Sequence, residues 1–178
     1  MSSSYEKLLN TAFRFVSFRP RSEKEIVQFL HAKAKKWNVI DLGVLTNVTN
    51  RLRELGYVND KKFVTWWIEQ RQSHRPKGMR LIAQELTNKG ISKDTISEIL
   101  EARNNRDNDE ASADYISEEE GARKAVQKKL AIWKKLPKRE QKRKIYGYLG
   151  RRGFTGDSIR RVVDEVVKNE VEYGIKDC

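Results

Sequence analysis

The sequence predicts an all-α protein built from stacked helical units, and three observations predict this class. Apolar residues recur at spacings of three and four along most of the chain, which is the period of one helical face. The alternating apolar and polar order of strands, with hairpin dipeptides between them, does not occur. One signature of leucine, glycine and aspartate occurs three times, and such repetition is typical of elongated arrays of helices.

Prolines separate the expected helices. Pro20, Pro76 and Pro137 each lie between two apolar-periodic runs, and a proline tends to end a helix because it lacks the backbone donor. Behind Pro20, Ser22 and Glu25 have the spacing of a capping box, which predicts a helix that starts there. The apolar faces of the expected helices are, in chain order, Ile26, Phe29 and Leu30; Leu45, Val48, Leu52 and Leu55; Phe63, Trp66 and Trp67; Met79, Ile82 and Leu86; Ile96, Ile99 and Leu100; Ala122, Val126, Leu130 and Trp133; Ile145 and Leu149; and Ile159, Val162 and Val163.

The repeated signature consists of a leucine, three residues, a glycine, an apolar residue, two residues and an aspartate. It spans Leu52–Asp60, Leu86–Asp94 and Leu149–Asp157. If the glycine is the first residue beyond a helix, it adopts the left-handed conformation at little steric cost, and the leucine and the apolar residue touch in a Schellman cap. The aspartate falls near the start of the next helix, where a carboxylate meets unpaired N–H groups. Each copy therefore predicts a helix, a tight turn and a second helix.

The charge of the chain is positive and uneven. Thirty-seven Lys and Arg residues against 25 Asp and Glu residues give a net charge of +12, and a basic surface attracts nucleic acid or acidic protein faces. Residues 106–121 carry seven acidic side chains and one basic one, which indicates a solvated linker, whereas residues 122–161 carry 15 basic and two acidic ones. We expect a first repeat over residues 1–58, a second over 59–104, an acidic linker over 105–121, and a basic third repeat with an acidic tail over 122–178.

Composition argues against several classes of protein. Cys178 is the one cysteine, so no intramolecular disulfide can form, which suits a reducing cytoplasm. No apolar run is long enough to cross a bilayer, and the first residues lack the order of a secretory signal. His31 and His74, expected on a helix surface and in a turn, lie in different segments, so neither a zinc set nor a Cys–His pair has motif spacing. The sequence predicts a cytoplasmic protein without metal or other cofactor, membrane partner or enzymatic activity.

Basic residues form the candidate binding site. Arg139, Lys142 and Arg143 share one side of the helix expected after Pro137, and such a stripe binds phosphates with salt-sensitive affinity and little base preference. The arginine-rich turn around Pro76 can grip phosphate or carboxylate groups bidentately. The candidate residues are Arg71, Arg75, Lys77, Arg80, Lys138, Arg139, Lys142, Arg143, Lys144, Arg151, Arg152, Arg160 and Arg161.

Aromatic residues are the second kind of candidate. Trp66 and Trp67 point about 100° apart on a helix, so we expect one in the core and the other partly exposed, where it could stack on a base. Tyr146 and Tyr148 are placed to pack beside the basic helix.

Taken together, these segments resemble the RecX family of bacterial recombination regulators. That family shows a Gly-Tyr pair followed by Asp and Phe, an arginine-rich turn with Gly and Pro, and a helix that ends in Gln-Glu-Leu-x-x-x-Gly-Ile. The matching segments here are Gly56–Phe63, Arg71, Arg75–Gly78 and Ile82–Ile91, with Ala12–Phe15 and Pro20–Ile26 similar to the opening repeat and Leu149–Phe154 and Ile159–Arg161 to the closing one. The resemblance covers residues 8–166 and departs at residues 35–39 and 103–121.

The resemblance implies nine helices in three three-helix repeats, with a curved shape. An elongated monomer fits this array, and the basic stripe predicts non-specific binding to single-stranded and double-stranded DNA. The resemblance implies binding to the recombinase RecA and its filament on single-stranded DNA, in the groove of the filament. It further implies inhibition of ATP hydrolysis, strand exchange and filament growth by RecA, and a place in recombination, DNA repair and the SOS response. Two alternatives stay open: a helix-turn-helix DNA-binding protein that acts without RecA, and a metal-dependent nuclease.

Overall fold

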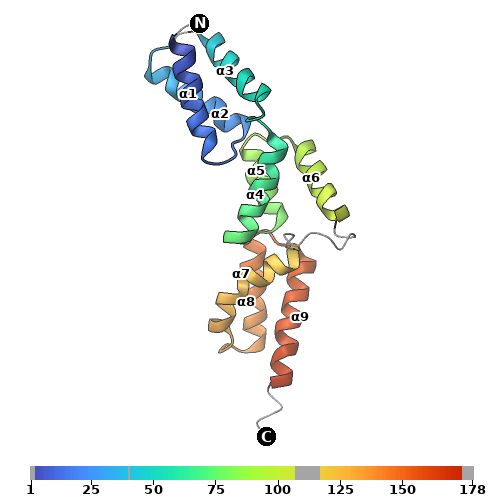
Figure 1. The fold of residues 1–178 in the computed structure, drawn as a ribbon. Helices are drawn as coiled ribbons and strands as arrows, with labels where there is room; N and C mark the ends of the chain where they lie inside the picture. Colours follow the sequence, from blue (N-terminus) through green and yellow to red (C-terminus); the bar gives the residue numbers. More distant parts are fainter. Residues whose placement is uncertain (1–2, 40, 107–116, 174–178) are drawn as a thin grey trace. The chain divides into compact units, whose positions relative to one another are not determined.

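The described part of the chain is helical outside its turns. The computed structural model describes residues 3–39, 41–106 and 117–173, and over these it contains nine α-helices and no strand (Figure 1). In chain order they are α1 (Ser3–Ser17), α2 (Glu23–Lys36), α3 (Leu42–Glu54), α4 (Asp60–His74), α5 (Met79–Asn88), α6 (Lys93–Arg106), α7 (Glu118–Trp133), α8 (Lys138–Arg151) and α9 (Gly156–Tyr173). The predicted all-α repeat fold is confirmed, and the elongated, curved shape stays a prediction.

Two compact units divide the chain. The first contains residues 1–67 and 86–108, and the second contains residues 68–85 and 109–178, so that the boundary falls within α4 and within α5. The repeat boundaries expected at residues 58, 104 and 121 stay predictions. None of the helices over the described ranges is both long and apolar enough to cross a membrane.

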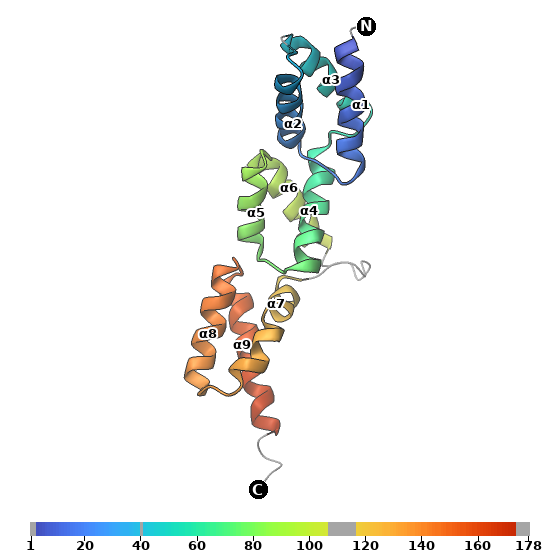
Figure 2. The ribbon, with the colours of Figure 1, turned by 90° about the vertical axis from the view of Figure 1, so that its left-hand side faces the viewer.

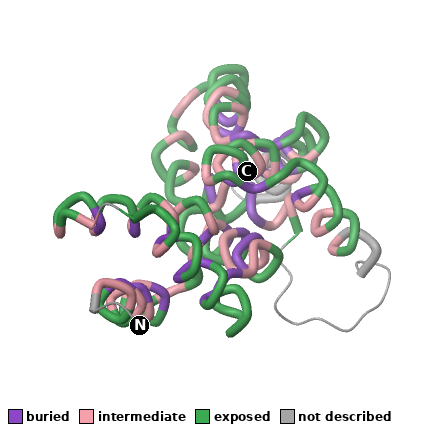
Figure 3. Tube along the Cα trace, turned by 90° about the horizontal axis from the view of Figure 1, so that it is seen from above, coloured by how far each residue is buried: buried purple, intermediate pink, exposed green. Residues whose placement is uncertain are grey.

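Each unit has its own hydrophobic core. Helices α1, α2 and α3 pack against one another in the first unit, and α7, α8 and α9 do so in the second (Figure 2). Buried and exposed residues alternate along the helices wherever burial is described (Figure 3). The first core contains Leu8, Ala12, Val16, Ile26, Leu30, Ala34, Leu45, Val48, Leu52 and Val58; the second contains Ala122, Ala125, Val126, Ile145, Leu149, Phe154, Ile159, Val162 and Val163.

Most residues of the predicted apolar faces are buried, and the others are half-buried or exposed. The half-buried ones besides the two tryptophans are Phe29, Met79, Ile99, Leu100, Leu130 and Trp133. Leu55, the C-cap of α3, is 44% exposed. Trp66 and Trp67 are both half-buried, whereas the sequence suggested one in the core. A cation lies over each indole ring. The Arg19 guanidinium is 5.4 Å from the Trp66 ring centroid, and the Lys89 ammonium is 4.4 Å from the Trp67 ring centroid.

The three predicted glycine turns are present. Gly56, Gly90 and Gly153 have φ values of +76°, +88° and +82°, the left-handed region that glycine enters without steric cost. In the first turn the Tyr57 N–H donates to the Leu52 carbonyl at 2.9 Å and the Gly56 N–H to the Arg53 carbonyl at 2.9 Å, which is the Schellman pattern. The same two bonds recur after α5 and after α8. The sequence signature is therefore a helix C-cap, as expected.

The aspartates of the signature lie in the first turns of α4, α6 and α9, as predicted, but other residues cap these helices. Side chains of Asn59, Ser92 and Thr155 accept the backbone N–H bonds at the three helix starts. Asp60 instead accepts the Glu23 N–H at 3.1 Å, so it caps the start of α2 in the same unit. The predicted capping box of Ser22 and Glu25 is confirmed at that helix.

A close approach of two backbones holds the turn before α5 on the turn after α8, and both turns belong to the second unit. The Gly78 N–H donates to the Arg152 carbonyl at 3.0 Å. A Cβ atom on Gly78 would lie 2.1 Å from the Gly153 carbonyl oxygen, a distance that no real contact reaches. Only glycine fits at position 78.

We predict that Gly78→Ala lowers the free energy of unfolding by about 1–3 kcal/mol, since the backbone must shift to admit a methyl group. Gly150→Ala is the matched control, because its Cβ would meet nothing within 4 Å in α8. Alanine there should raise the stability by about 0.5–1 kcal/mol, the usual gain over glycine in a helix. Urea denaturation measures both changes, and equal effects of the two variants would contradict the steric account.

Candidate nucleic-acid and partner interface

All thirteen candidate residues lie in the second compact unit. The unit joins residues 68–85, which contain the arginine-rich turn, to residues 109–178, which contain the basic helix. The sequence had assigned these two groups to separate repeats. The thirteen candidate residues fall into two groups. Some form hydrogen bonds or ion pairs with neighbouring residues, and the others face solvent.

Arg152 is a cation with a structural role. Its Nη1 donates to the Pro76 carbonyl at 3.1 Å, and its guanidinium lies 4.8 Å from the centroid of the Tyr148 ring. One turn further along, the Met79 N–H donates to the Glu118 carboxylate at 3.3 Å. These contacts join α5, α7 and α8 around the turn at residues 75–78.

Arg71 and Lys77 share one carboxylate, that of Glu85. Arg71 Nε lies 2.7 Å from Glu85 Oε2, and Lys77 binds Oε1 of the same group. Burial alone would raise the pKa of Glu85, but hydrogen bonds from Lys77 and Arg71 outweigh it and hold this pKa below its ordinary value. The two cations are therefore engaged within the fold.

The cations at the start of α9 form surface ion pairs. Arg160 lies 2.7 Å from Asp157 and Arg161 lies 3.3 Å from Glu119, and both arginines are exposed. Exposed pairs of this kind contribute at most about 1 kcal/mol, so an incoming anion can displace the carboxylate at little cost.

The remaining eight candidates are exposed and have no side-chain hydrogen bond or ion pair with any described residue. They are Arg75, Arg80, Lys138, Arg139, Lys142, Arg143, Lys144 and Arg151. Helix α8 turns Gln141, Ile145 and Leu149 into the core. Positions 139 and 143 lie on the opposite side of this helix, so the predicted stripe of Arg139, Lys142 and Arg143 faces solvent with its charge uncompensated.

Tyr146 extends the stripe, whereas its place in the sequence predicted only packing beside the basic helix. Its side chain is 43% exposed and follows Lys142 and Arg143 by four and three residues, which places the ring on the same side of α8. The spacing that selected Arg139, Lys142 and Arg143 could have selected this ring too. Lysines near the end of α7 were also missed, although Lys128, Lys129, Lys134 and Lys135 are exposed in the same unit.

The arrangement can bind anions. Lysine and arginine side chains neutralise phosphates without reading bases, and an exposed tyrosine ring can stack on an unpaired base. Over the described ranges, no three His, Cys, Asp or Glu side chains lie together in a way that could hold a metal ion. His31 and His74 are exposed in separate helices, while Cys178 lies outside the described residues.

We predict that Glu85→Gln lowers the free energy of unfolding by about 1–2 kcal/mol at pH 7, since two charge-assisted hydrogen bonds are weakened at a partly exposed site. Because its pKa is lower in the folded protein, Glu85 stabilises the fold above the unfolded pKa of about 4.3, and this contribution is lost as the pH falls through the folded value. The difference between wild type and variant should therefore shrink below about pH 4.

Glu98→Gln is the control for this variant, because Glu98 makes an ion pair with Lys61 in which both side chains are mostly exposed. Its effect on urea denaturation should stay below about 1 kcal/mol at every pH. A Glu85→Gln effect that does not change between pH 7 and pH 3 would show that the ion pairs with Arg71 and Lys77 do not stabilise this turn.

Family models and curated relatives place the chain among known proteins. The model described as RecX, second three-helix domain, matches residues 59–100, and that described as RecX, third three-helix domain, matches residues 117–163. The regulatory protein RecX of Bacillus subtilis (strain 168) is 32% identical over 161 residues, which cover 90% of this chain and 55% of that protein. The regulatory protein RecX of Chlorobium phaeobacteroides (strain BS1) is 29% identical over 164 residues, which cover 92% of this chain and 96% of that protein. The chain thus spans just over half the length of the Bacillus relative.

Solved structures share the fold. The crystal structure of RecX from Lactobacillus salivarius superposes with a TM-score of 0.72 at 20% identity, over 93% of this chain and 98% of that one. A second structure, of a regulatory protein RecX, has a TM-score of 0.68 at 20% identity, over 90% of this chain and 73% of that one. The two domain models together match half of the present sequence, and the second domain precedes the third along the chain. The chain belongs to the RecX family of regulatory proteins.

Proposed function

We propose that this protein binds RecA and its filament on single-stranded DNA, and that it inhibits ATP hydrolysis, strand exchange and filament growth. The observation that carries the proposal is the solvent-facing stripe of Arg139, Lys142, Arg143 and Tyr146 on α8, whose cations have no partner among the described residues. The stripe lies within residues 117–163, the part that matches the third RecX domain.

Physical blocking is the mechanism that these residues support. A row of cations on one helix side follows a phosphate backbone, and the release of counterions from the nucleic acid supplies affinity that falls as salt rises. The positions of the phosphates carry no sequence code, so we expect non-specific binding to single-stranded and double-stranded DNA. A monomer bound in this way in the cytoplasm would occlude RecA surfaces or bridge RecA subunits without any covalent step.

A non-enzymatic role is part of the proposal. The curated relatives are named regulatory proteins, not enzymes. Binding to the filament is thus sufficient for the regulation we propose.

We predict that the protein lowers DNA-dependent ATP hydrolysis by RecA of the same organism, and that the triple variant Arg139→Glu, Lys142→Glu and Arg143→Glu loses this effect. The concentration for half-inhibition should rise by about tenfold or more, because each lost phosphate contact weakens binding and each new carboxylate repels the backbone. The triple variant Arg14→Glu, Lys36→Glu and Lys93→Glu changes the net charge equally at exposed positions of the first unit. It is the matched control and should change half-inhibition by less than about threefold.

Unchanged ATP hydrolysis at saturating wild-type protein would refute the proposed action on RecA. Equal losses in the two triple variants would show that net charge, and not the stripe on α8, carries the effect. Strong preference for one duplex sequence in a binding assay would instead favour the helix-turn-helix alternative.

A further inference from the structure

We propose that a groove in the first unit is a second nucleic-acid site, where Arg21 on one wall and Lys62 on the other contact phosphates of a single strand and its bases stack on Phe18 or Tyr57. The inference relies on the proposed function only for the class of ligand. It concerns a different unit of the chain and residues outside the thirteen candidates, and it can fail or hold independently of the stripe on α8.

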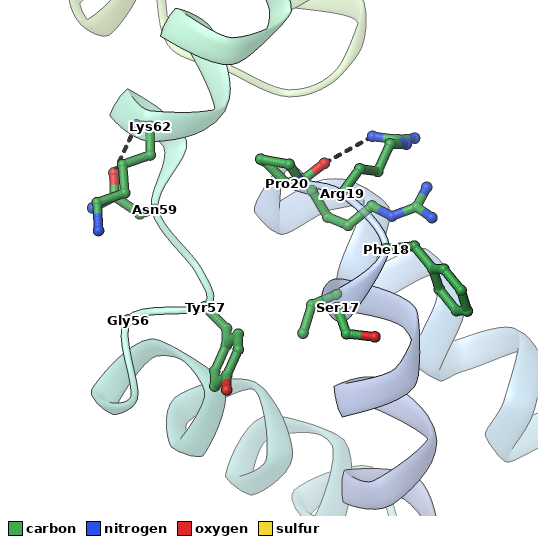
Figure 4. Close-up of a pocket in the computed structure, with 10 residues that line it drawn as sticks. Ser17, Phe18, Arg19, Pro20, Gly56, Tyr57, Asn59 and Lys62 are labelled. Carbon is green, nitrogen blue, oxygen red and sulfur yellow. Dashed lines mark hydrogen bonds between the residues drawn. The ribbon is translucent and has the colours of Figure 1, made fainter.

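The groove lies between two turns of the first unit and has a volume of about 350 Å³. Its lining residues are Val16, Ser17, Phe18, Arg19, Pro20, Arg21, Gly56, Tyr57, Asn59 and Lys62. Figure 4 shows Ser17, Phe18, Arg19 and Pro20 along the turn from α1 to α2, and Tyr57, Asn59 and Lys62 along the segment that leads into α4. A ligand in the groove would therefore contact both segments at once.

The charge of the lining is entirely positive. Three cations and no acidic side chain line the groove. Arg19 is paired, since its Nη2 lies 3.1 Å from Glu25 Oε1, an oxygen that it shares with Lys89. Lys62 is exposed, and its ammonium has no partner among the described residues. An anion would thus meet net positive charge on both sides of the groove.

Arg21 is partly buried, and the groups that its guanidinium contacts directly are uncharged. Its Nε donates to the Phe15 carbonyl at 3.2 Å, and its guanidinium lies 3.9 Å from the centroid of the Phe15 ring. No carboxylate of the described residues lies within ion-pair distance of it. Burial, together with the charge of Arg19, lowers the pKa of Arg21, and the carboxylate of Glu25 offsets only part of this. Phe15 in turn stacks on Phe29 at 4.0 Å, so the guanidinium is held in place for a ligand.

Two aromatic rings at the groove are available for stacking. The Phe18 side chain is 84% exposed and the Tyr57 side chain is 47% exposed. Tyr57 is oriented by an edge contact with Phe13, whose ring centroid lies 5.5 Å away. A base that stacks on such a ring gains about 1–3 kcal/mol. Rings beside cations are the combination that single-strand binding requires.

Backbone bonding favours a nucleic acid over an acidic peptide. The N–H groups of Gly56 and Tyr57 donate to carbonyls of α3, and the N–H of Lys62 donates to the Asn59 side chain. This wall of the groove therefore offers no amide donors at these positions to a peptide backbone. Side-chain cations and ring faces remain, and these match phosphate and base.

The test measures binding of the full chain to a fluorescein-labelled dT15 oligonucleotide across a salt series. The variant Phe18→Ala with Lys62→Gln removes an exposed ring and an unpaired cation from the groove. We expect its affinity to fall about 5- to 20-fold, with the slope of log K against log salt smaller by about 0.7, the value for one single-strand phosphate contact.

Leu42→Ala with Lys36→Gln is the matched control, because both residues are exposed in the same unit and lie outside this groove. It should stay within about twofold of wild type. Crosslinking with iododeoxyuridine in the oligonucleotide should label Phe18 or Tyr57.

Three results would overturn the inference: absence of dT15 binding by wild type, equal affinities of the groove variant and its control, or crosslinks confined to α8. Loss of the crosslinks at Phe18 and Tyr57 on addition of a glutamate dodecamer, but not of unlabelled dT15, would assign the groove to an acidic peptide. The effect of the α8 triple variant on RecA tests the proposed function separately, so failure of one leaves the other standing.

Discussion

The left-handed glycine that ends α3, α5 and α8 is the constraint on which the rest of the structure depends. It allows the last carbonyls of each helix to be satisfied by the two residues that leave it, and so directs the chain into the next helix within a few residues. At Gly153 the same residue also permits close packing, since a Cβ atom there would lie 2.9 Å from the Leu81 backbone nitrogen. The left-handed turn at position 153 and the close packing of α5 on this turn therefore both require a glycine there.

In the second unit, burial separates the structural cations from those available for binding. A partly buried charge needs a carboxylate, a carbonyl or a ring beside it, because desolvation without compensation is costly. Arg71 and Lys77 meet this need through Glu85, and Arg152 meets it through the Pro76 carbonyl and the Tyr148 ring. The cations of α8 stay hydrated and need no partner, so they retain their charge for a ligand. Net charge alone therefore overstates the size of the binding surface.

Local spacing explains what could be predicted, and distance along the chain explains what could not. The helix faces, the capping box at Ser22 and the three glycine turns depend on residues three to five positions apart, and all of these were predicted. The pairing of Arg152 with Pro76 joins residues 76 positions apart, and the capping of α2 by Asp60 spans 37. Such contacts join residues too far apart along the chain to be visible in the spacing of helix faces. The groove at Arg21 was missed for the same reason, since two turns far apart in sequence form it.

An exposed ring beside a cation that no carboxylate pairs occurs in both units, and this combination bears on the kind of nucleic acid bound. Tyr146 follows Lys142 and Arg143 on α8, and Phe18 lies three residues before Arg21 in the groove. In a duplex the base faces are covered by stacking, so rings at these places would gain nothing that the cations do not already supply. In a single strand the base faces are open, and each ring adds stacking energy to the phosphate contact. The placement of the rings therefore favours single-stranded DNA over duplex DNA as the ligand, in agreement with a filament as the target and against a recognition helix that reads base edges.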